Sequence, residues 1–133
     1  MNHLFTYRLP ALQQTAPLGV LLLLASALAV ILALVILAEM VVLQLLNWGD
    51  LRTSARAALL ANLASCPVAL AALWLAPRFG LGGLLLGLVL SITIEGSVLH
   101  ALRRGTPGHN WLVAVASNLA SWLVIIIPIY WMR

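Results

Sequence analysis

Two stretches of the chain repeat each other: EMVVLQLLNWGDLRTSARAALLANLAS at residues 39–65 and EGSVLHALRRGTPGHNWLVAVASNLAS at residues 95–121. The offset is 56 residues, and ten of the 27 aligned positions are identical, where this Leu- and Ala-rich composition alone gives about three. Each stretch contains the end of one apolar run, a polar turn and the start of the next apolar run. The repeat therefore predicts two tandem helical hairpins.

The composition places these hairpins in a membrane. Apolar residues make up 64% of the 133-residue chain and charged residues 8%, against about 45–50% and 25% in soluble domains. Four apolar runs are each at least as long as the ~20 residues that cross a bilayer. The runs cover residues 17–46, 54–76, 81–102 and 110–132. We expect an all-α, multi-pass integral membrane protein that folds as a four-helix bundle, in a bacterial or archaeal cytoplasmic membrane.

The repeat also divides the chain. The first transmembrane hairpin is expected at residues 17–77 and the second at residues 78–133. Because each hairpin crosses the membrane twice, both copies have the same orientation, which makes this a parallel repeat with a pseudo-twofold axis along the membrane normal. Residues 1–16 mix apolar side chains with Arg8, Pro10 and two Gln residues, a composition that suits an interfacial or disordered tail.

Charge and cysteine content exclude several classes of function. All seven basic residues are Arg, the acids number three, and the net charge of +4 is spread thinly along the chain. Nucleic-acid binding needs a concentrated basic surface, so we expect no nucleic-acid partner. The single Cys66 has no second thiol for a disulfide and lacks the paired spacing of a zinc or redox site. No metal site is predicted.

Three pairs of polar residues occupy equivalent positions inside the apolar runs. They are Glu39 and Glu95, Asn62 and Asn118, and Ser65 and Ser121. The interval from Glu to Asn is 23 residues in both hairpins and its midpoint falls in the turn, so the two side chains should lie at the same depth on antiparallel helices. About nine helical residues, or ~14 Å, separate them from the turn, which places them near the middle of the membrane. We expect the six residues to form one polar layer.

Two interpretations of this layer remain open. A carboxyl inside a membrane must be protonated, paired or hydrated, because its charge costs about 2.5–3.5 kcal/mol at the centre of a membrane helix. The Asn amides and Ser hydroxyls can hydrogen-bond to the carboxyls and hold the hairpins together as a structural clasp. Alternatively, Glu39 and Glu95 bind a proton or a cation that the protein carries.

A strip of small residues precedes the second Glu. Gly83, Gly87 and Ser91 recur every fourth residue and lead to Glu95, so we expect another helix to pack closely against this strip.

The Trp and His residues favour a role in placing the protein in the membrane over a role in binding a cofactor. His100 is a weak candidate for an axial cofactor ligand, because it is the one His within an apolar run, but no cofactor is predicted. Trp48 should flank a membrane edge as part of an aromatic belt. Trp122 lies in mid-span and should face lipid or a neighbouring subunit.

The sequence contains no set of residues typical of catalysis. No Ser, His and acid share one depth, and no glycine-rich phosphate loop precedes a helix, so we expect no enzymatic activity. Small size, short loops and apolar surfaces favour an accessory or structural subunit of a larger membrane complex, such as an energy-transducing one. The alternative is a small oligomeric transporter or channel that uses Glu39 and Glu95 as proton or cation sites. The expected partners are the lipid bilayer and other membrane subunits or further copies of this chain.

Overall fold

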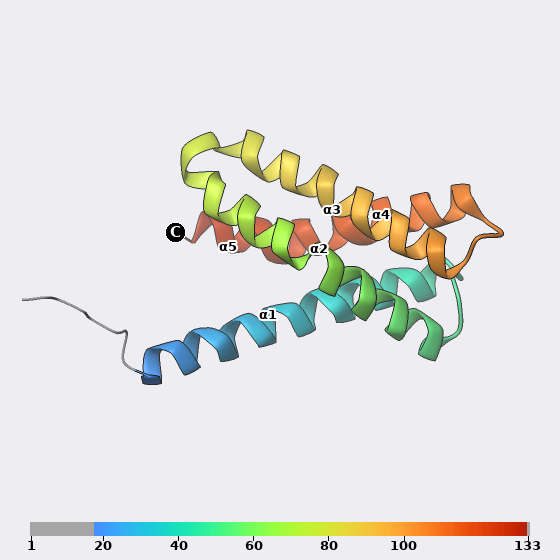
Figure 1. Ribbon diagram of the computed structural model, residues 1–133, viewed down its shortest axis with the longest axis horizontal. Coiled ribbons are helices and arrows are strands. Elements are labelled where there is room, and N and C mark those ends of the chain that lie inside the picture. Colours follow the sequence, from blue (N-terminus) through green and yellow to red (C-terminus); the bar gives the residue numbers. More distant parts are fainter. Residues whose placement is uncertain (1–17, 133) are drawn as a thin grey trace, which may run out of the picture.

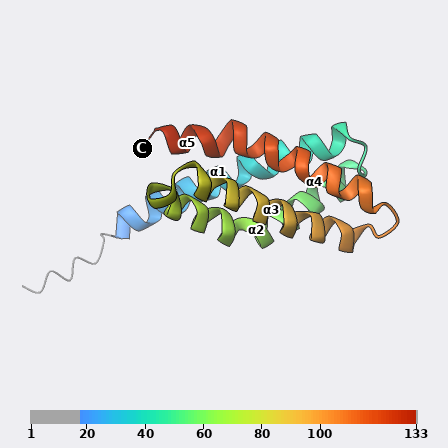
Figure 2. The ribbon, with the colours of Figure 1, turned by 90° about the horizontal axis from the view of Figure 1, so that it is seen from above.

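The structure, a computed structural model, describes residues 18–132 and is helical over nearly all of that range (Figures 1 and 2). Its elements are α1 (Leu18–Leu45), α2 (Leu51–Phe79), α3 (Leu81–Leu102), α4 (Pro107–Ser121), the π-helical segment η1 (Trp122–Ile126) and α5 (Ile127–Trp131). Four helices, counting α4 and η1 as one, are long and apolar enough to cross a membrane. The prediction of an all-α fold with four such helices is confirmed. The tail predicted at residues 1–16 lies outside the described residues.

The four long helices form a ring in which each contacts two others. α2 packs against α1 and α3, and α4 packs against α3 and α1. The α1–α2 turn and the α3–α4 turn lie at one end of the bundle, and the α2–α3 connection lies at the other (Figure 1). α1 and α3 are therefore diagonal to each other, as are α2 and α4.

Particular residues explain where α2 begins and where it ends. Asp50 is its N-cap, and the Thr53 backbone N–H donates a hydrogen bond to Asp50 Oδ1 at 2.7 Å. Hydrogen bonding from Thr53 holds the pKa of the exposed Asp50 below its ordinary value. At the other end, α2 continues through Pro77, just past the apolar run, to Phe79. It ends at Gly80, whose φ of 55° lies in the left-handed region that glycine tolerates.

The fourth spanning helix differs from its prediction in two ways. It begins earlier than expected, at Pro107, because the missing N–H of proline costs nothing at a first helical position. It then changes to the π-helical segment η1, where the Ile127 N–H donates to the Trp122 C=O five residues back. Pro128 follows at once and lacks the N–H that a regular α-helix would use there.

The first half of α1 stands away from the bundle. Every residue from Leu18 to Val30 is exposed, and the buried residues of α1 are Glu39 and Leu43. Figure 1 shows this half diverging from the other helices. Only the second half of α1 therefore belongs to the packed core.

Two hydrophobic clusters lie on either side of the buried polar residues. The cluster nearer the hairpin turns contains Leu43, Trp48, Ala57, Leu99, Val113 and Ala114, and the other contains Ala72, Ala76, Leu84, Trp122 and Ile126. Trp122 is only 6% exposed, so the prediction that it faces lipid or a neighbouring subunit was wrong. Trp48 lies in the α1–α2 turn, but it is 1% exposed and packs inside the bundle instead of flanking it.

Trp48 connects the two hairpin turns. Its indole Nε1–H donates to Asn110 Oδ1 at 2.7 Å, and Asn110 Nδ2 donates to the Arg103 C=O at 2.6 Å. The Arg103 guanidinium donates in turn to the Trp48 C=O. Because Asn110 is completely buried, both of its hydrogen bonds are needed to offset its loss of water. The closed set of bonds fixes one turn against the other.

Gly87 lets α2 and α3 approach closely. A Cβ at this position would lie 2.2 Å from Ala72 Cβ on α2 and 3.0 Å from the Trp122 ring. The absence of a side chain therefore makes room for both Ala72 and the buried indole. Gly82, in the same helix, has nothing within 4 Å of its Cβ position.

We expect Gly87→Ala to lower the free energy of unfolding by about 1–3 kcal/mol, because the added methyl group overpacks the contact with Ala72. Gly82→Ala is the matched control and should be neutral or stabilising by about 0.5–1 kcal/mol, since alanine favours a helix more than glycine does. Thermal unfolding in detergent measures both variants. Equal Tm values would contradict the close approach of α2 and α3.

Trp48→Phe tests the connection between the turns. The substitution keeps an aromatic ring but leaves the buried Asn110 Oδ1 without its donor, so the free energy of unfolding should fall by about 1–3 kcal/mol. Trp74→Phe, at a position that is 67% exposed, is the control and should change little. If both variants unfold at the same temperature in detergent, the hydrogen bond to Asn110 does not contribute to stability.

Candidate functional site

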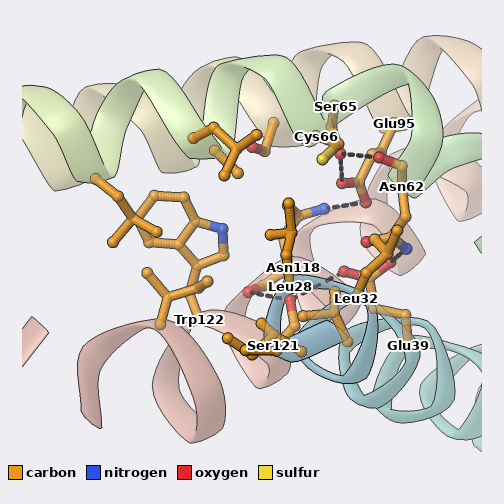
Figure 3. Close-up of a pocket in the computed structure, with 18 of the residues that line it drawn as sticks. Leu28, Leu32, Glu39, Asn62, Ser65, Cys66, Glu95, Asn118, Ser121 and Trp122 are labelled. Atoms are coloured by element: carbon orange, nitrogen blue, oxygen red, sulfur yellow. Dashed lines mark hydrogen bonds between the residues drawn. The ribbon is translucent and has the colours of Figure 1, made fainter. Parts of the chain in front are cut away.

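Six polar side chains meet at the centre of the bundle. Glu39 comes from α1, Asn62 and Ser65 from α2, Glu95 from α3, and Asn118 and Ser121 from α4. Each is buried, with at most 4% of its surface exposed. All four helices thus contribute to one group of side chains, which we call the polar layer (Figure 3).

The first carboxyl of the polar layer bonds to both neighbouring helices. Asn62 Nδ2 donates to Glu39 Oε2 at 2.5 Å, and Ser121 Oγ donates to Glu39 Oε1 at 2.9 Å. The Asn belongs to the same hairpin as the Glu, whereas the Ser comes from the other hairpin. Glu39 therefore joins α1 to both α2 and α4.

The second carboxyl has the same pattern. Asn118 Nδ2 donates to Glu95 Oε2 at 2.6 Å, and Ser65 Oγ donates to Glu95 Oε1 at 2.5 Å. Again the Asn lies in the same hairpin and the Ser in the other. Every oxygen of the two carboxyls thus accepts one hydrogen bond, and the hairpins exchange their Ser donors.

The donors are held in place by their own helices. Asn62 Nδ2 also donates to the Ala58 C=O at 2.9 Å, and Asn118 Nδ2 donates to the Ala114 C=O at 3.0 Å. Ser121 Oγ lies 3.2 Å from the Asn118 C=O, which offers its hydroxyl a second acceptor. Each Asn amide is therefore oriented by its own helix toward the carboxyl that it contacts.

No positive charge balances the two carboxyls within the described residues. Their hydrogen-bond donors are amides and hydroxyls, which are uncharged, and Glu39 and Glu95 are close enough to interact with each other. Two adjacent carboxylates excluded from water cannot both stay ionised without a proton or a cation between them. The polar layer therefore has the chemistry of a site for one positive charge.

A cavity of about 290 Å³ adjoins the polar layer. Its walls are apolar side chains of α1, α2 and η1, among them Leu28, Leu32 and Leu70, and one end is formed by the six polar residues. Ser91 and Trp122 also line it. Figure 3 shows the indole of Trp122 on the opposite side of the cavity from Glu95.

The other predicted site residues have separate places. Gly83 and Gly87 are buried against α2, Gly83 near Phe79 and Ala76 and Gly87 near Ala72, so they serve helix packing. His100 is exposed on α3, away from the cavity lining, and no metal-binding cluster occurs among residues 18–132.

Sequence reasoning missed two parts of the site. Cys66 lines the cavity beside the polar layer, and Trp122 closes its far side. Both follow directly after a predicted Ser of the layer, and this adjacency is the one signal that could have identified them. The apolar wall on α1 had no such signal, because every residue there is a hydrophobe like its neighbours.

The polar layer predicts a difference between two substitutions of each Glu. Glu39→Gln and Glu95→Gln should keep the fold, because the Gln carbonyl accepts from the Asn and the Gln amide donates to the Ser, whose hydroxyl turns to its own helix. Glu→Leu leaves one buried N–H of the Asn without an acceptor and should lower the free energy of unfolding by about 1–3 kcal/mol at either site. Thermal unfolding in detergent is the measurement. Equal tolerance of Gln and Leu would contradict the role of the carboxyls in holding the hairpins together.

Comparisons with known proteins found no match among family models, curated proteins or solved structures. The polar layer and its cavity are the observations from which a function can be inferred.

Proposed function

We propose that the chain is a four-span integral membrane protein, and that Glu39 and Glu95 form a proton or cation site in a small transport protein. The two hairpins are related as a parallel repeat about an axis along the membrane normal. The polar layer lies near the middle of the membrane, on that axis. Binding of a charge, not catalysis, is the role of its side chains.

Several features support the membrane assignment. The helices present large apolar side chains to the outside along their length, an arrangement that water would not tolerate but hydrocarbon does. Arg52 and Arg104 are exposed at the end that carries the hairpin turns. At the other end, the guanidinium carbon of Arg78 lies 5.4 Å from the centre of the Trp74 ring, a pair suited to the membrane interface.

Two features support the parallel repeat. Glu39 and Glu95 accept hydrogen bonds from equivalent Asn and Ser residues, with the same exchange between hairpins. Both hairpin turns also lie at the same end of the bundle (Figure 1). A rotation that exchanges the hairpins would therefore exchange the two carboxyls.

One observation carries the functional proposal. The two carboxyls have only uncharged donors and form the end of a cavity, instead of being sealed within the core. A purely structural clasp needs no cavity beside it, and it must bear the repulsion of a second acid in contact with the first. A site that takes up and releases a positive charge needs both.

The second candidate is an accessory or structural subunit of a larger membrane complex. The observation that favours it is the exposed first half of α1, from Leu18 to Val30, which could pack against another membrane subunit. In that case the polar layer acts as a clasp alone. Purification from native membranes separates the candidates, because a subunit would co-migrate with stoichiometric partners and a transporter would migrate as copies of this chain.

Proton flux into liposomes tests the transport proposal. The purified chain is reconstituted with a trapped pH-sensitive dye, and a K⁺ diffusion potential drives protons inward. We expect the wild type to exceed empty liposomes and the double variant Glu39→Gln/Glu95→Gln to lose at least about tenfold in rate, because an amide cannot carry a proton.

The third acid of the chain provides the control. Asp50→Asn keeps an N-cap oxygen, changes an exposed group outside the polar layer and should leave the flux unchanged. Flux that persists in the Glu double variant, or a wild type that matches empty liposomes, would contradict transport through this site.

A further inference from the structure

The cavity beside the polar layer is long and narrow. Its lining on α1 extends from Leu24 to Glu39, which corresponds to ~22 Å of helix at 1.5 Å per residue. Across from α1 it is lined by Ala69 and Leu70 of α2. Its volume of about 290 Å³ is at the lower limit of small-molecule sites. A slender molecule would fit this shape better than a bulky one.

Unused polar groups lie at the end of the cavity. Ser91 Oγ is buried and has no hydrogen-bond partner within the described residues, although a helical Ser can bond to the carbonyl one turn back. It lines the cavity one turn before Glu95. Each carboxyl group has about four lone-pair sites, and the Asn and Ser donors use two of them. The layer can therefore accept further hydrogen bonds without losing those it has.

The opposite side of this end is aromatic. The Trp122 indole lies across the cavity from Glu95, with its N–H edge directed toward the polar layer. The carboxyl pair is therefore the part of the cavity that favours a positive charge. A neutral hydroxyl head would gain one hydrogen bond but would leave the carboxyl pair dependent on a bound proton.

We propose that this cavity binds a slender apolar molecule with one primary ammonium head, which contacts the two carboxyls from the cavity while its apolar part lies along α1 and α2. This inference rests on the proposed function, since it names the class of cation that the site takes. The ammonium donates to Glu39, Glu95 and Ser91 Oγ, which matches its three N–H groups. The bare first half of α1 borders the cavity on the side from which an amphipathic molecule would enter from lipid.

Cys66 makes the site measurable without an added label. It is the single cysteine of the chain, is partly exposed and lines the cavity beside Ser65. The rate at which a small, membrane-permeant maleimide alkylates Cys66 therefore reports whether the cavity is occupied. Decylammonium is the test ligand, and 1-decanol, with the same chain and a neutral head, is the comparison.

We expect decylammonium to slow alkylation of Cys66 at concentrations about tenfold lower than 1-decanol, because only its head forms charge-assisted hydrogen bonds. Glu95→Gln should remove most of this preference, and Ser91→Ala should weaken it by less. Ser97→Ala, an exposed Ser on the same helix, is the control for Ser91→Ala and should leave protection unchanged.

Filling the cavity tests where the apolar part lies. Ala69→Leu places a larger side chain in the cavity and should abolish protection by decylammonium, whereas Ala71→Leu, exposed and outside the lining, should not. If Cys66 proves unreactive even without ligand, the same five variants and two ligands are compared by the shift in Tm, since a ligand that binds the folded state raises it.

Three results would overturn the inference. Equal protection by decylammonium and 1-decanol would mean that the cavity takes any apolar chain, such as that of a lipid. Protection that survives Ala69→Leu would place the ligand elsewhere, and absence of protection or Tm shift would mean that no such ligand binds. The outcome of the proton-flux experiment is separate from the outcome of the binding experiment. Flux without amine binding would leave a proton site alone. Amine binding without flux would leave a ligand site in a protein that does not transport.

Discussion

The pairing of each buried carboxyl with an Asn from its own hairpin and a Ser from the other determines how the four helices fit together. A hydrogen bond tolerates errors of only a few tenths of an ångström, so four such bonds in one layer fix the depth and the rotation of every helix. The hydrophobic clusters on either side add packing but little register, because Leu and Ala side chains can slide along one another. In the proposed membrane setting, where apolar contacts between helices gain little over contacts with lipid, the polar layer is what specifies one arrangement.

The same arrangement also contains features that oppose stability and that a function can use. A layer designed only for stability would use one acid or none, since every additional buried carboxyl must be compensated. Here two acids interact across the bundle, and the space next to them is not filled. The helix that borders this space, α1, is also the one whose first half is bare. The molecule therefore combines a hydrogen-bonded polar layer with an unfilled space next to it.

The sequence was sufficient for the helices and for the expectation that Glu39 and Asn62 meet, because equal spacing from a turn gives equal depth on antiparallel helices. It was not sufficient to decide which Ser serves which Glu, since both hairpins carry the same residues and only the packing distinguishes them. The burial of Trp122 was missed for a similar reason: the space for its ring is made by Gly87, which lies 35 residues away in the chain. The π-helical segment depends on Pro128, whose effect on the preceding turn cannot be read from hydropathy.

The exchange of serines between hairpins has a consequence for biogenesis. The first hairpin leaves the ribosome before the second, and at that stage Glu39 has Asn62 as a partner but no Ser121, while Ser65 has no carboxyl to bind. Each hairpin can thus satisfy half of its acid by itself, which in the proposed membrane setting would lower the cost of insertion without completing the site. The second pair of bonds forms when the hairpins dock. Docking is therefore the step that completes the polar layer, and a chain interrupted after Gly80 would leave Glu39 without Ser121 and Ser65 without a carboxyl.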